Sequence, residues 1–309
     1  MTKTEIPSTS ISNRFRGCLL GLAVGDAVGT TVEFRPRGTF PLITDMTGGG
    51  PFKLKAGEWT DDTSMALCLA TSLVETGQFD AHDQMQRYCQ WMDSGYLSSN
   101  GRCFDIGVTV RLALARFKKT GEPLSGSTDP DSAGNGCLMR LAPVPMFFHA
   151  HREACIAMSG ESARTTHSAT ECIEASRLFG AMLYKAIGGA SREEILFAHG
   201  FSDTTSARLK LIARGEYTSK HEDDIQGSGY VVESLEAALW CFYKTDNFRE
   251  AILAATNLGQ DADTTAAICG QIAGACYGEA GIPESWRDQL ALGPEIARLA
   301  DRLAIGPTK

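Results

Sequence analysis

The sequence predicts an all-α protein that folds as a single domain. Apolar residues recur at spacings of three and four along seven segments, which is the period of a helix with one buried face. Alternation typical of a strand is almost absent, and only residues 40–43 hint at it. No long run of proline, serine or charge divides the 309 residues, so we expect one large domain rather than two average ones of about 150 residues.

The predicted helices cover residues 15–28, 64–74, 106–117, 175–187, 231–243, 248–255 and 264–277. Glycine-rich segments at 48–51, 121–136 and 227–229 predict loops between them. Residues 1–12 have no helical pattern and are expected to form a flexible N-terminal segment ahead of a folded domain at 13–309.

The first and last of these predicted helices contain glycines at every fourth position. They are Gly17, Gly21, Gly25 and Gly29, and then Gly270, Gly274 and Gly278. A glycine inside a helix costs roughly 1 kcal/mol relative to alanine, so such regular stripes indicate that another backbone approaches closely. Both helices are therefore expected to be central to the fold.

Composition narrows the class of protein. The net charge of −8 argues against a nucleic-acid or anionic-membrane surface, and suits a protein that concentrates divalent cations. The ten cysteines form no C-x-x-C pair and lie mostly in apolar helical runs, which favours a reduced, cytoplasmic chain. The N-terminus lacks the apolar stretch of a secretory signal, and the apolar run 18–32 is shorter than the ~20 residues that span a bilayer.

Two predicted helices begin with clusters of acidic and hydroxyl side chains, WTDDTS at 59–64 and GQDADTT at 259–265. Taken singly, each cluster is most simply a helix cap, because carboxylates and hydroxyls accept the unpaired N–H groups of a helix start. A cap needs only one side chain, however, and adjacent carboxylates repel unless something neutralises them.

A hard divalent cation would supply that neutralisation. Aspartate and threonine oxygens suit Mg²⁺ or Mn²⁺, whereas Zn²⁺ would call for His or Cys, which neither cluster contains. If the two helix starts converge, their oxygens could hold two metal ions about 3.5–4 Å apart. Such a metal pair fits hydrolysis or phosphoryl chemistry without distinguishing between them.

These motifs, with others in a fixed order, resemble the ADP-ribosylglycohydrolase family, which includes the dinitrogenase reductase-activating glycohydrolase. The resemblance extends from about Phe15 to Trp286. The matching stretches are RGCLLGLAVGDA (16–27), VEF (32–34), WTDD (59–62), FDIG (104–107), GNG (134–136), MR (139–140), TH (166–167), GYVV (229–232), NLG (257–259) and DADT (261–264). Any one of them is weak evidence, but the series in this order is specific.

The resemblance implies a single-domain orthogonal helical bundle and a binuclear magnesium centre, with Mn²⁺ as an alternative metal. The implied metal ligands are Thr60, Asp61, Asp62, Asp261, Asp263 and Thr264. Glu33 is similar to a mobile glutamate that lies over this centre and ligates a metal when substrate is absent. Asp105 is similar to an acidic residue that faces the substrate ribose, and either carboxylate is a candidate general base.

Substrate-binding residues also follow from the resemblance. The loop with Ser132, Gly134, Asn135 and Gly136 resembles a cradle in which backbone N–H groups approach a pyrophosphate. His167 resembles a residue near the same diphosphate and ribose, and Tyr230 belongs to a loop near the adenosine.

Two positions depart from the family pattern: Gln260 stands where glycine is common, and Ala133 where some relatives have an aromatic residue. Without the resemblance, Glu33 would be read as a solvated loop residue, Asp105 as a helix N-cap and His167 as structural. Cys103 is expected to be structural, and the acidic run 222–224 a solvated loop.

The resemblance therefore implies a Mg-dependent hydrolase that removes ADP-ribose from a modified protein side chain, with arginine favoured. The expected partners are an ADP-ribosylated protein and the product ADP-ribose, without membrane or nucleic acid, and the chain is expected to be a monomer. Three alternatives stay open here: an ADP-ribose-binding protein without activity, a hydrolase of another ADP-ribose conjugate, and a helical enzyme acting on diphosphates. The last expects a D-D-x-x-D cluster, whose third carboxylate is missing after Asp62.

Overall fold

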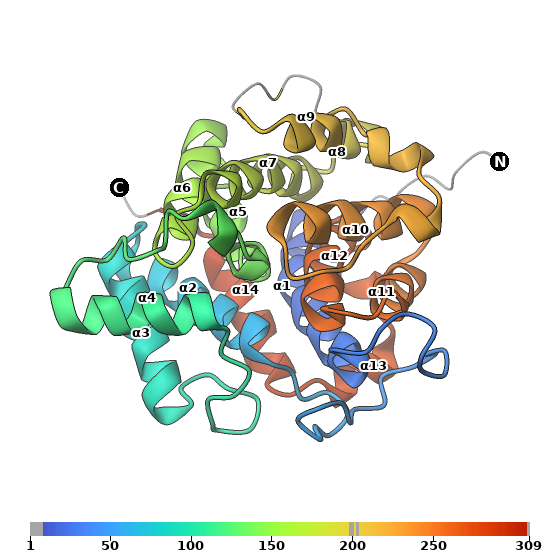
Figure 1. The fold of residues 1–309 in the computed structure, drawn as a ribbon, viewed down its shortest axis with the longest axis horizontal. Coiled ribbons are helices and arrows are strands. Elements are labelled where there is room, and N and C mark those ends of the chain that lie inside the picture. Colours follow the sequence, from blue (N-terminus) through green and yellow to red (C-terminus); the bar gives the residue numbers. More distant parts are fainter. Residues whose placement is uncertain (1–8, 198–200, 202–203, 308–309) are drawn as a thin grey trace.

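Helices are the only regular secondary-structure elements in the described part of the chain (Figure 1). A computed structural model of the chain describes residues 9–197, 201 and 204–307, and within them the only β-type pairings are isolated bridges. The α-helices are α1 (Ile11–Gly29), α2 (Asp61–Thr76), α3 (Ala81–Ser94), α4 (Val108–Thr120), α5 (Pro143–Phe147), α6 (Arg152–Arg164), α7 (Thr170–Ile187), α8 (Arg192–Leu196), α9 (Ala207–Ala213), α10 (Val231–Lys244), α11 (Phe248–Asn257), α12 (Ala262–Tyr277), α13 (Glu284–Gln289) and α14 (Gly293–Leu303).

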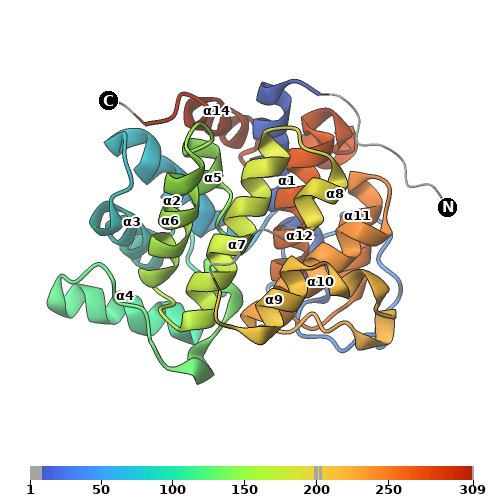
Figure 2. The same ribbon diagram turned by 90° about the horizontal axis from the view of Figure 1, so that it is seen from above.

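The centre of the fold is the pair α1 and α12, which pack against each other in opposite directions (Figures 1 and 2). Their glycine stripes face each other in register. A Cβ atom added at Gly17 would lie 2.3 Å from the carbonyl oxygen of Gly274, and one at Gly21 would lie 2.3 Å from that of Gly270. The predicted close helix approach is therefore confirmed, and both helices have buried, largely apolar surroundings.

The remaining helices surround this pair. Helices α10 and α11 pack on α12, α14 packs on α1, and α7 connects the central pair to α6. Helices α2 and α3 lie on the side of the central pair opposite α10 and α11, with α4 next to α3 (Figure 2). Because α1 ends and α12 begins at the same end of the molecule, the segments after Gly29 and before Ala262 lie side by side.

All seven predicted helical segments fall in helices, namely α1, α2, α4, α7, α10, α11 and α12. Only α4 begins later than its apolar pattern, at Val108 rather than at residue 106. Helices such as α3, α6 and α14 went unpredicted, because their apolar residues are few and charged residues interrupt them. The hint of a strand at residues 40–43 was wrong, since this segment is an irregular loop.

The N-terminal boundary differs by two residues from the predicted one. Helix α1 begins at Ile11, and the side chain of Ser10 accepts the N–H of Asn13 as its N-cap, whereas residues 1–8 lie outside the described part. The ten cysteines are unpaired, and all but Cys103 are buried. The acidic run 222–224 is exposed, as expected for a solvated segment.

One helical segment, Ile11–Val32, is long and apolar enough to cross a membrane by length and composition. The apolar run predicted from the sequence, residues 18–32, was therefore shorter than this helical segment. In this structure 89% of its apolar window is buried inside the protein, against α12 and its neighbours, and the core helix of a soluble protein passes the same test.

A methyl group added to the glycine stripe should destabilise the fold. In a Gly25→Ala variant the new Cβ would lie 2.1 Å from the carbonyl oxygen of Ala266, so the two backbones must separate. We expect the free energy of unfolding to fall by about 1–3 kcal/mol or more, the usual cost of overpacking. Urea unfolding of Gly107→Ala is the control, because a Cβ there meets no atom within 4 Å. Equal stability of the two variants would contradict the close-packing account.

Candidate active site

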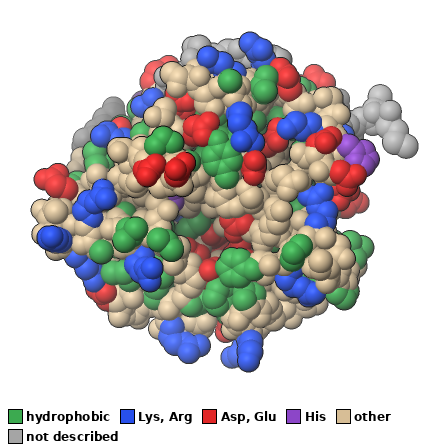
Figure 3. Space-filling view, viewed as in Figure 1, with side chains coloured by type: hydrophobic (Ala, Val, Ile, Leu, Met, Phe, Trp, Pro, Cys, Tyr) green, Lys and Arg blue, Asp and Glu red, His purple; other side chains and the backbone are tan. Residues whose placement is uncertain are grey.

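A cleft with a volume of about 710 Å³ opens where the ends of α1, α2 and α12 meet. The space-filling view shows acidic side chains on the floor of this hollow, with apolar side chains around its mouth (Figure 3). Eleven of the predicted site residues line it, and they are Glu33, Asp61, Asp62, Asp105, Gly134, Asn135, Gly136, His167, Asp261, Asp263 and Thr264. Thr60, Ser132 and Tyr230 do not line the cleft.

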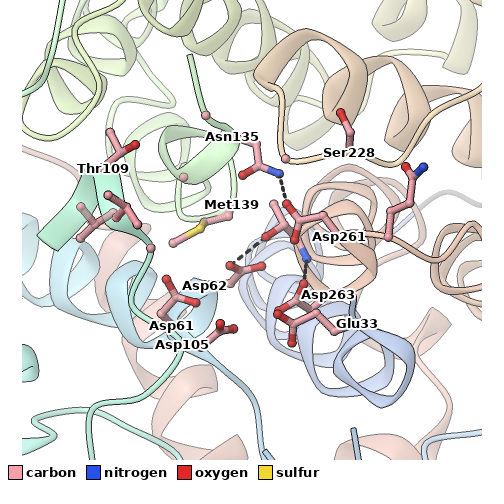
Figure 4. Close-up of a pocket in the computed structure, with 18 of the residues that line it drawn as sticks. Glu33, Asp61, Asp62, Asp105, Thr109, Asn135, Met139, Ser228, Asp261 and Asp263 are labelled. Carbon is pink, nitrogen blue, oxygen red and sulfur yellow. Dashed lines mark hydrogen bonds between the residues drawn. The ribbon is translucent and has the colours of Figure 1, made fainter. Parts of the chain in front are cut away.

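The two acidic helix starts converge on the floor of the cleft (Figure 4). The Thr60 hydroxyl lies 3.3 Å from Oδ2 of Asp263, and the Thr264 hydroxyl donates to Oδ1 of Asp62 over 3.2 Å. These contacts join residues that are about two hundred positions apart in the sequence. The acidic helix start of α2 therefore lies directly against that of α12.

The N-cap side chains of the two clusters do not cap their helices, although Oδ1 of Asp263 accepts the N–H of Thr264 in the first turn of α12 over 2.8 Å. The N-cap residues Thr60 of α2 and Asp261 of α12 make no side-chain hydrogen bond to their own helices. For α2 this task falls to Asp26 of α1, a fully buried carboxylate. Its Oδ1 accepts the N–H and the hydroxyl of Thr60 at 2.8 and 2.9 Å, and its Oδ2 accepts those of Thr63 at 3.0 and 2.6 Å. Thr60, Asp61 and Asp62 are thus free of the capping role.

A third group of carboxylates completes the floor. Oxygens of Glu33, Asp105 and Asp263 all lie within 4.8 Å of one another, an arrangement that can hold a metal ion. Glu33 is only 3% exposed and so is not a solvated loop residue. Asp105 has a left-handed backbone with φ of 58°, and α4 begins three residues later with Gly107 as its N-cap. Asp105 is therefore not a helix cap but a loop residue whose side chain faces the cluster.

Among the described residues, no Lys, Arg or His forms an ion pair that compensates this concentration of charge. None of the ion pairs among the described residues involves a carboxylate of the cleft. Burial, reinforced by neighbouring carboxylates, raises the pKa of Glu33 to about 9 and that of Asp105 to about 7. The pKa values of Asp62 and Asp263 are also raised, again chiefly by burial.

The donors fit a hard divalent cation. Oδ2 of Asp62 is buried and has no hydrogen-bond partner among the described residues, which leaves a carboxylate oxygen free to bind a metal. Carboxylate and hydroxyl oxygens are the ligands that such cations prefer. A bound cation would also relieve the repulsion that raises the pKa values of these carboxyl groups.

The loop 134–136 lines the cleft and also contacts the acidic cluster. The side-chain amide of Asn135 donates to Oδ2 of Asp261 over 2.7 Å, so it holds one of the acidic residues (Figure 4). Two of the backbone N–H groups expected to approach a pyrophosphate are already used. Gly134 donates to the carbonyl of Ser132 at 2.7 Å and Asn135 to that of Gly229 at 3.0 Å.

Tyr230, a predicted substrate-binding residue, and Ala133, one of the two departures from the family pattern, do not line the cleft. Tyr230 donates its hydroxyl to Glu171, and the guanidinium of Arg208 lies 5.0 Å from the centre of its ring. Its neighbours Ser228 and Gly229 line the cleft instead. Ala133 is buried and accepts the N–H of Val231 at 3.0 Å, which pairs this loop with the start of α10.

Gln260, which stands where glycine is common in the family, has a backbone conformation that favours glycine. Both Gln260 and Phe34 have left-handed backbones, with φ of 58° and 61°. Phe34 donates its N–H to the carbonyl of Gln260, and Gln260 donates to that of Arg35, each over 2.7 Å. This pair of bonds fixes Glu33 beside the second acidic motif, and the left-handed conformation explains why glycine suits position 260.

Sequence reasoning missed Asp26 and the apolar lining of the cleft. Asp26 belongs to the quoted motif, and its burial inside an apolar helix was the signal that could have revealed its role. Phe34 and Val108 also line the cleft although they are 65% and 62% exposed. Phe34 belongs to the quoted VEF motif, but its place in the lining was not predicted, and none of the quoted motifs contains Val108.

The raised pKa values give the metal-free protein a specific pH dependence. Glu33 and Asp105 hold protons in the folded state that the unfolded chain releases near its ordinary pKa values of 4.5 and 3.8. Stability is therefore greatest at low pH within this window and falls as the pH rises from about 5 to about 9. Thermal unfolding in EDTA should show this loss, and Mg²⁺ should reverse it because it binds the deprotonated carboxylates. Glu33→Gln should flatten the curve; a flat curve in the unmodified chain would contradict the charge account.

Comparison with known proteins shows the family of the chain. The chain matches the sequence model of the ADP-ribosylglycohydrolase family over residues 7–309. It is 45% identical over 298 residues to the ADP-ribosylarginine hydrolase Tri1 of Serratia proteamaculans, covering 96% of this chain and 81% of that protein. It is 34% identical to the ADP-ribosyl-[dinitrogen reductase] glycohydrolase of Rhodospirillum rubrum, covering 95% and 96% of the two chains.

A solved structure supports the same assignment. The fold superposes on an ADP-ribosylglycohydrolase-related protein complex with a TM-score of 0.86 and 41% sequence identity, covering 96% of this chain and 99% of that one. The fold class and the sequence thus agree, and the chain belongs to the ADP-ribosylglycohydrolase family, whose members hydrolyse glycosidic bonds.

Proposed function

We propose that this protein removes ADP-ribose from ADP-ribosylated arginine, and that it needs two magnesium ions to do so. The observation that carries the proposal is the convergence of two aspartate-bearing helix starts, whose carboxylates form no ion pair among the described residues. The relatives described as ADP-ribosylarginine hydrolases, at 45% and 46% identity, support arginine as the acceptor.

Thr60, Asp61, Asp62, Asp261, Asp263 and Thr264 would hold the ions, together with Glu33 when substrate is absent. When bound, magnesium would act as a Lewis acid that orients the ribose hydroxyls and lowers the pKa of water. Asp26 holds the Thr60 hydroxyl from behind, and Asn135 holds Asp261, so that these ligands are oriented before any ion arrives.

The protein's own groups would then carry the proton transfers. Asp105 is the one carboxylate of the floor outside the proposed ligand set, so we assign it the general base that takes a proton from the attacking water. The bond that breaks joins the anomeric carbon of ribose to a guanidine nitrogen, through a transition state with oxocarbenium character. The departing guanidine nitrogen takes up the proton that Asp105 removed from water, so the arginine leaves as a guanidinium cation. The acidic walls of the cleft favour this cation and the positive charge of the transition state.

The test is a panel of defined substrates carrying ADP-ribose on arginine, serine or a nucleic-acid end, read by release of free ADP-ribose. We expect turnover of the arginine conjugate with Mg²⁺ and none in EDTA. Release from the serine or nucleic-acid conjugate alone would move the assignment to another linkage. Binding of ADP-ribose without turnover of any conjugate would make the protein a binding module.

Variants locate the activity in the cleft. Asp61→Ala and Asp263→Ala should each reduce the rate of release by at least about 10²-fold, the order of loss expected when an electrostatic group of a site is removed. Both should keep the helical circular dichroism spectrum and cooperative unfolding, because each removes one carboxylate from a repelling cluster. Asp263→Ala also removes the acceptor of the Thr264 N–H, a loss of about 1 kcal/mol that leaves the fold intact. Asp223→Ala, an exposed acidic position away from the cleft, is the matched control and should stay fully active. Full activity of Asp263→Ala would refute the metal site.

A further inference from the structure

Three side chains form a buried polar chain behind the loop 134–136: Arg140, Thr166 and His167. Arg140 and Thr166 have no exposed surface, and His167 is 2% exposed at the wall of the cleft. Each is bonded to the next, and the last one reaches the site.

Arg140 starts the chain. Its Nη1 donates to the carbonyl of Gly136 over 2.8 Å, and its Nη2 donates to the Thr166 hydroxyl oxygen over 2.7 Å. The guanidinium also lies 5.0 Å from the centre of the Tyr88 ring. None of the ion pairs among the described residues includes Arg140, so its positive charge is held by dipoles and an aromatic face alone.

The hydrogen bond from Arg140 to Thr166 determines which atom donates in the hydrogen bond from Thr166 to His167. A guanidinium only donates, so the Thr166 oxygen must accept from Arg140, and its single hydroxyl hydrogen is left to donate. The one further partner described for this oxygen is Nδ1 of His167, 2.8 Å away. If Nδ1 carried the proton instead, the buried hydroxyl hydrogen would lack an acceptor, which costs about 1–3 kcal/mol.

His167 is therefore an acceptor at Nδ1, and its proton lies on Nε2. This nitrogen is above the glycine loop, since a Cβ at Gly136 would lie 3.1 Å from it and one at Gly134 would lie 3.4 Å away. Burial, followed by the nearby charge of Arg140, lowers the pKa of His167 to about 3, so the ring is neutral at physiological pH. His167 lines the cleft, and the side-chain hydrogen bond described for its ring is made at Nδ1, so Nε2–H is available as a donor at this wall.

We propose that Arg140 and Thr166 are positioning residues that hold His167 in the neutral Nε2–H tautomer, where it donates to an anionic oxygen of the substrate. That this oxygen belongs to the diphosphate of ADP-ribose rests on the proposed function; the tautomer does not. In this arrangement Nε2 of His167 stays protonated across the neutral pH range. The ring does not need to take up a further proton when the substrate binds.

The tautomer is tested directly by long-range ¹H–¹⁵N NMR spectra of the ¹⁵N-histidine-labelled protein at pH 7, with His167→Gln used to assign the ring signals. The expected spectrum shows an unprotonated Nδ1 and a protonated Nε2 that do not change between pH 6 and pH 8. A protonated Nδ1, or an imidazolium at pH 7, would overturn the proposal.

Two matched variants separate positioning from mere packing. Thr166→Val keeps the shape but removes the hydroxyl, whereas Thr166→Ser keeps the hydroxyl. In Thr166→Val we expect a mixture of tautomers, together with a roughly ten-fold weaker Kd for ADP-ribose and a higher KM at nearly unchanged kcat, as loss of one hydrogen bond predicts. Thr166→Ser should restore the tautomer and bring the Kd to within about two-fold of the unmodified chain.

The two proposals fail in different ways. A Thr166→Val protein with the same tautomer and the same ADP-ribose affinity would refute the positioning role. If the unmodified chain fails to bind ADP-ribose in Mg²⁺, the proposed function is wrong, yet the ring spectra still decide the tautomer.

Discussion

Repulsion between buried carboxylates is the constraint on which the site depends. Glu33, Asp61, Asp62, Asp105, Asp261 and Asp263 line one cleft, and no lysine or arginine among the described residues pairs with them. Burial disfavours their charged forms and each neighbour adds to the effect, so the pKa of Glu33 rises to about 9. Such an arrangement is costly unless protons or cations occupy it, and cations bring the chemistry that hydrolysis requires.

The tightly packed helices α1 and α12 hold the carboxylates together against this repulsion. The glycine stripes bring α1 and α12 so close that Gly29 lies against the backbone of Ala262 and Asp263, which sets the second acidic motif beside the end of α1. From α1, Asp26 holds the start of α2 through four hydrogen bonds, so the first motif is fixed by the same helix. One pair of tightly packed helices thus positions both halves of the site, and the carboxylates cannot move apart to relieve their repulsion.

Much of this architecture could be predicted from the sequence, because helical periodicity, glycine stripes and paired acidic helix starts are local patterns. The contacts between distant segments could not be. Asp26 reads as a polar interruption in an apolar helix until α2 is seen to begin against it. Asn135 reads as a turn residue, but its amide holds Asp261, and Tyr230 turns its ring toward Glu171 rather than into the cleft. Their roles depend on side-chain directions that only tertiary packing determines.

The most direct measurement of the central claim is anomalous diffraction from crystals of this protein soaked in Mn²⁺, which takes the same oxygen ligands as Mg²⁺. The account predicts two peaks about 3.5–4 Å apart, between the start of α2 and the start of α12, within ligand distance of Asp62 and Asp263. Well-ordered crystals with no peak between these helix starts at millimolar Mn²⁺ would contradict it.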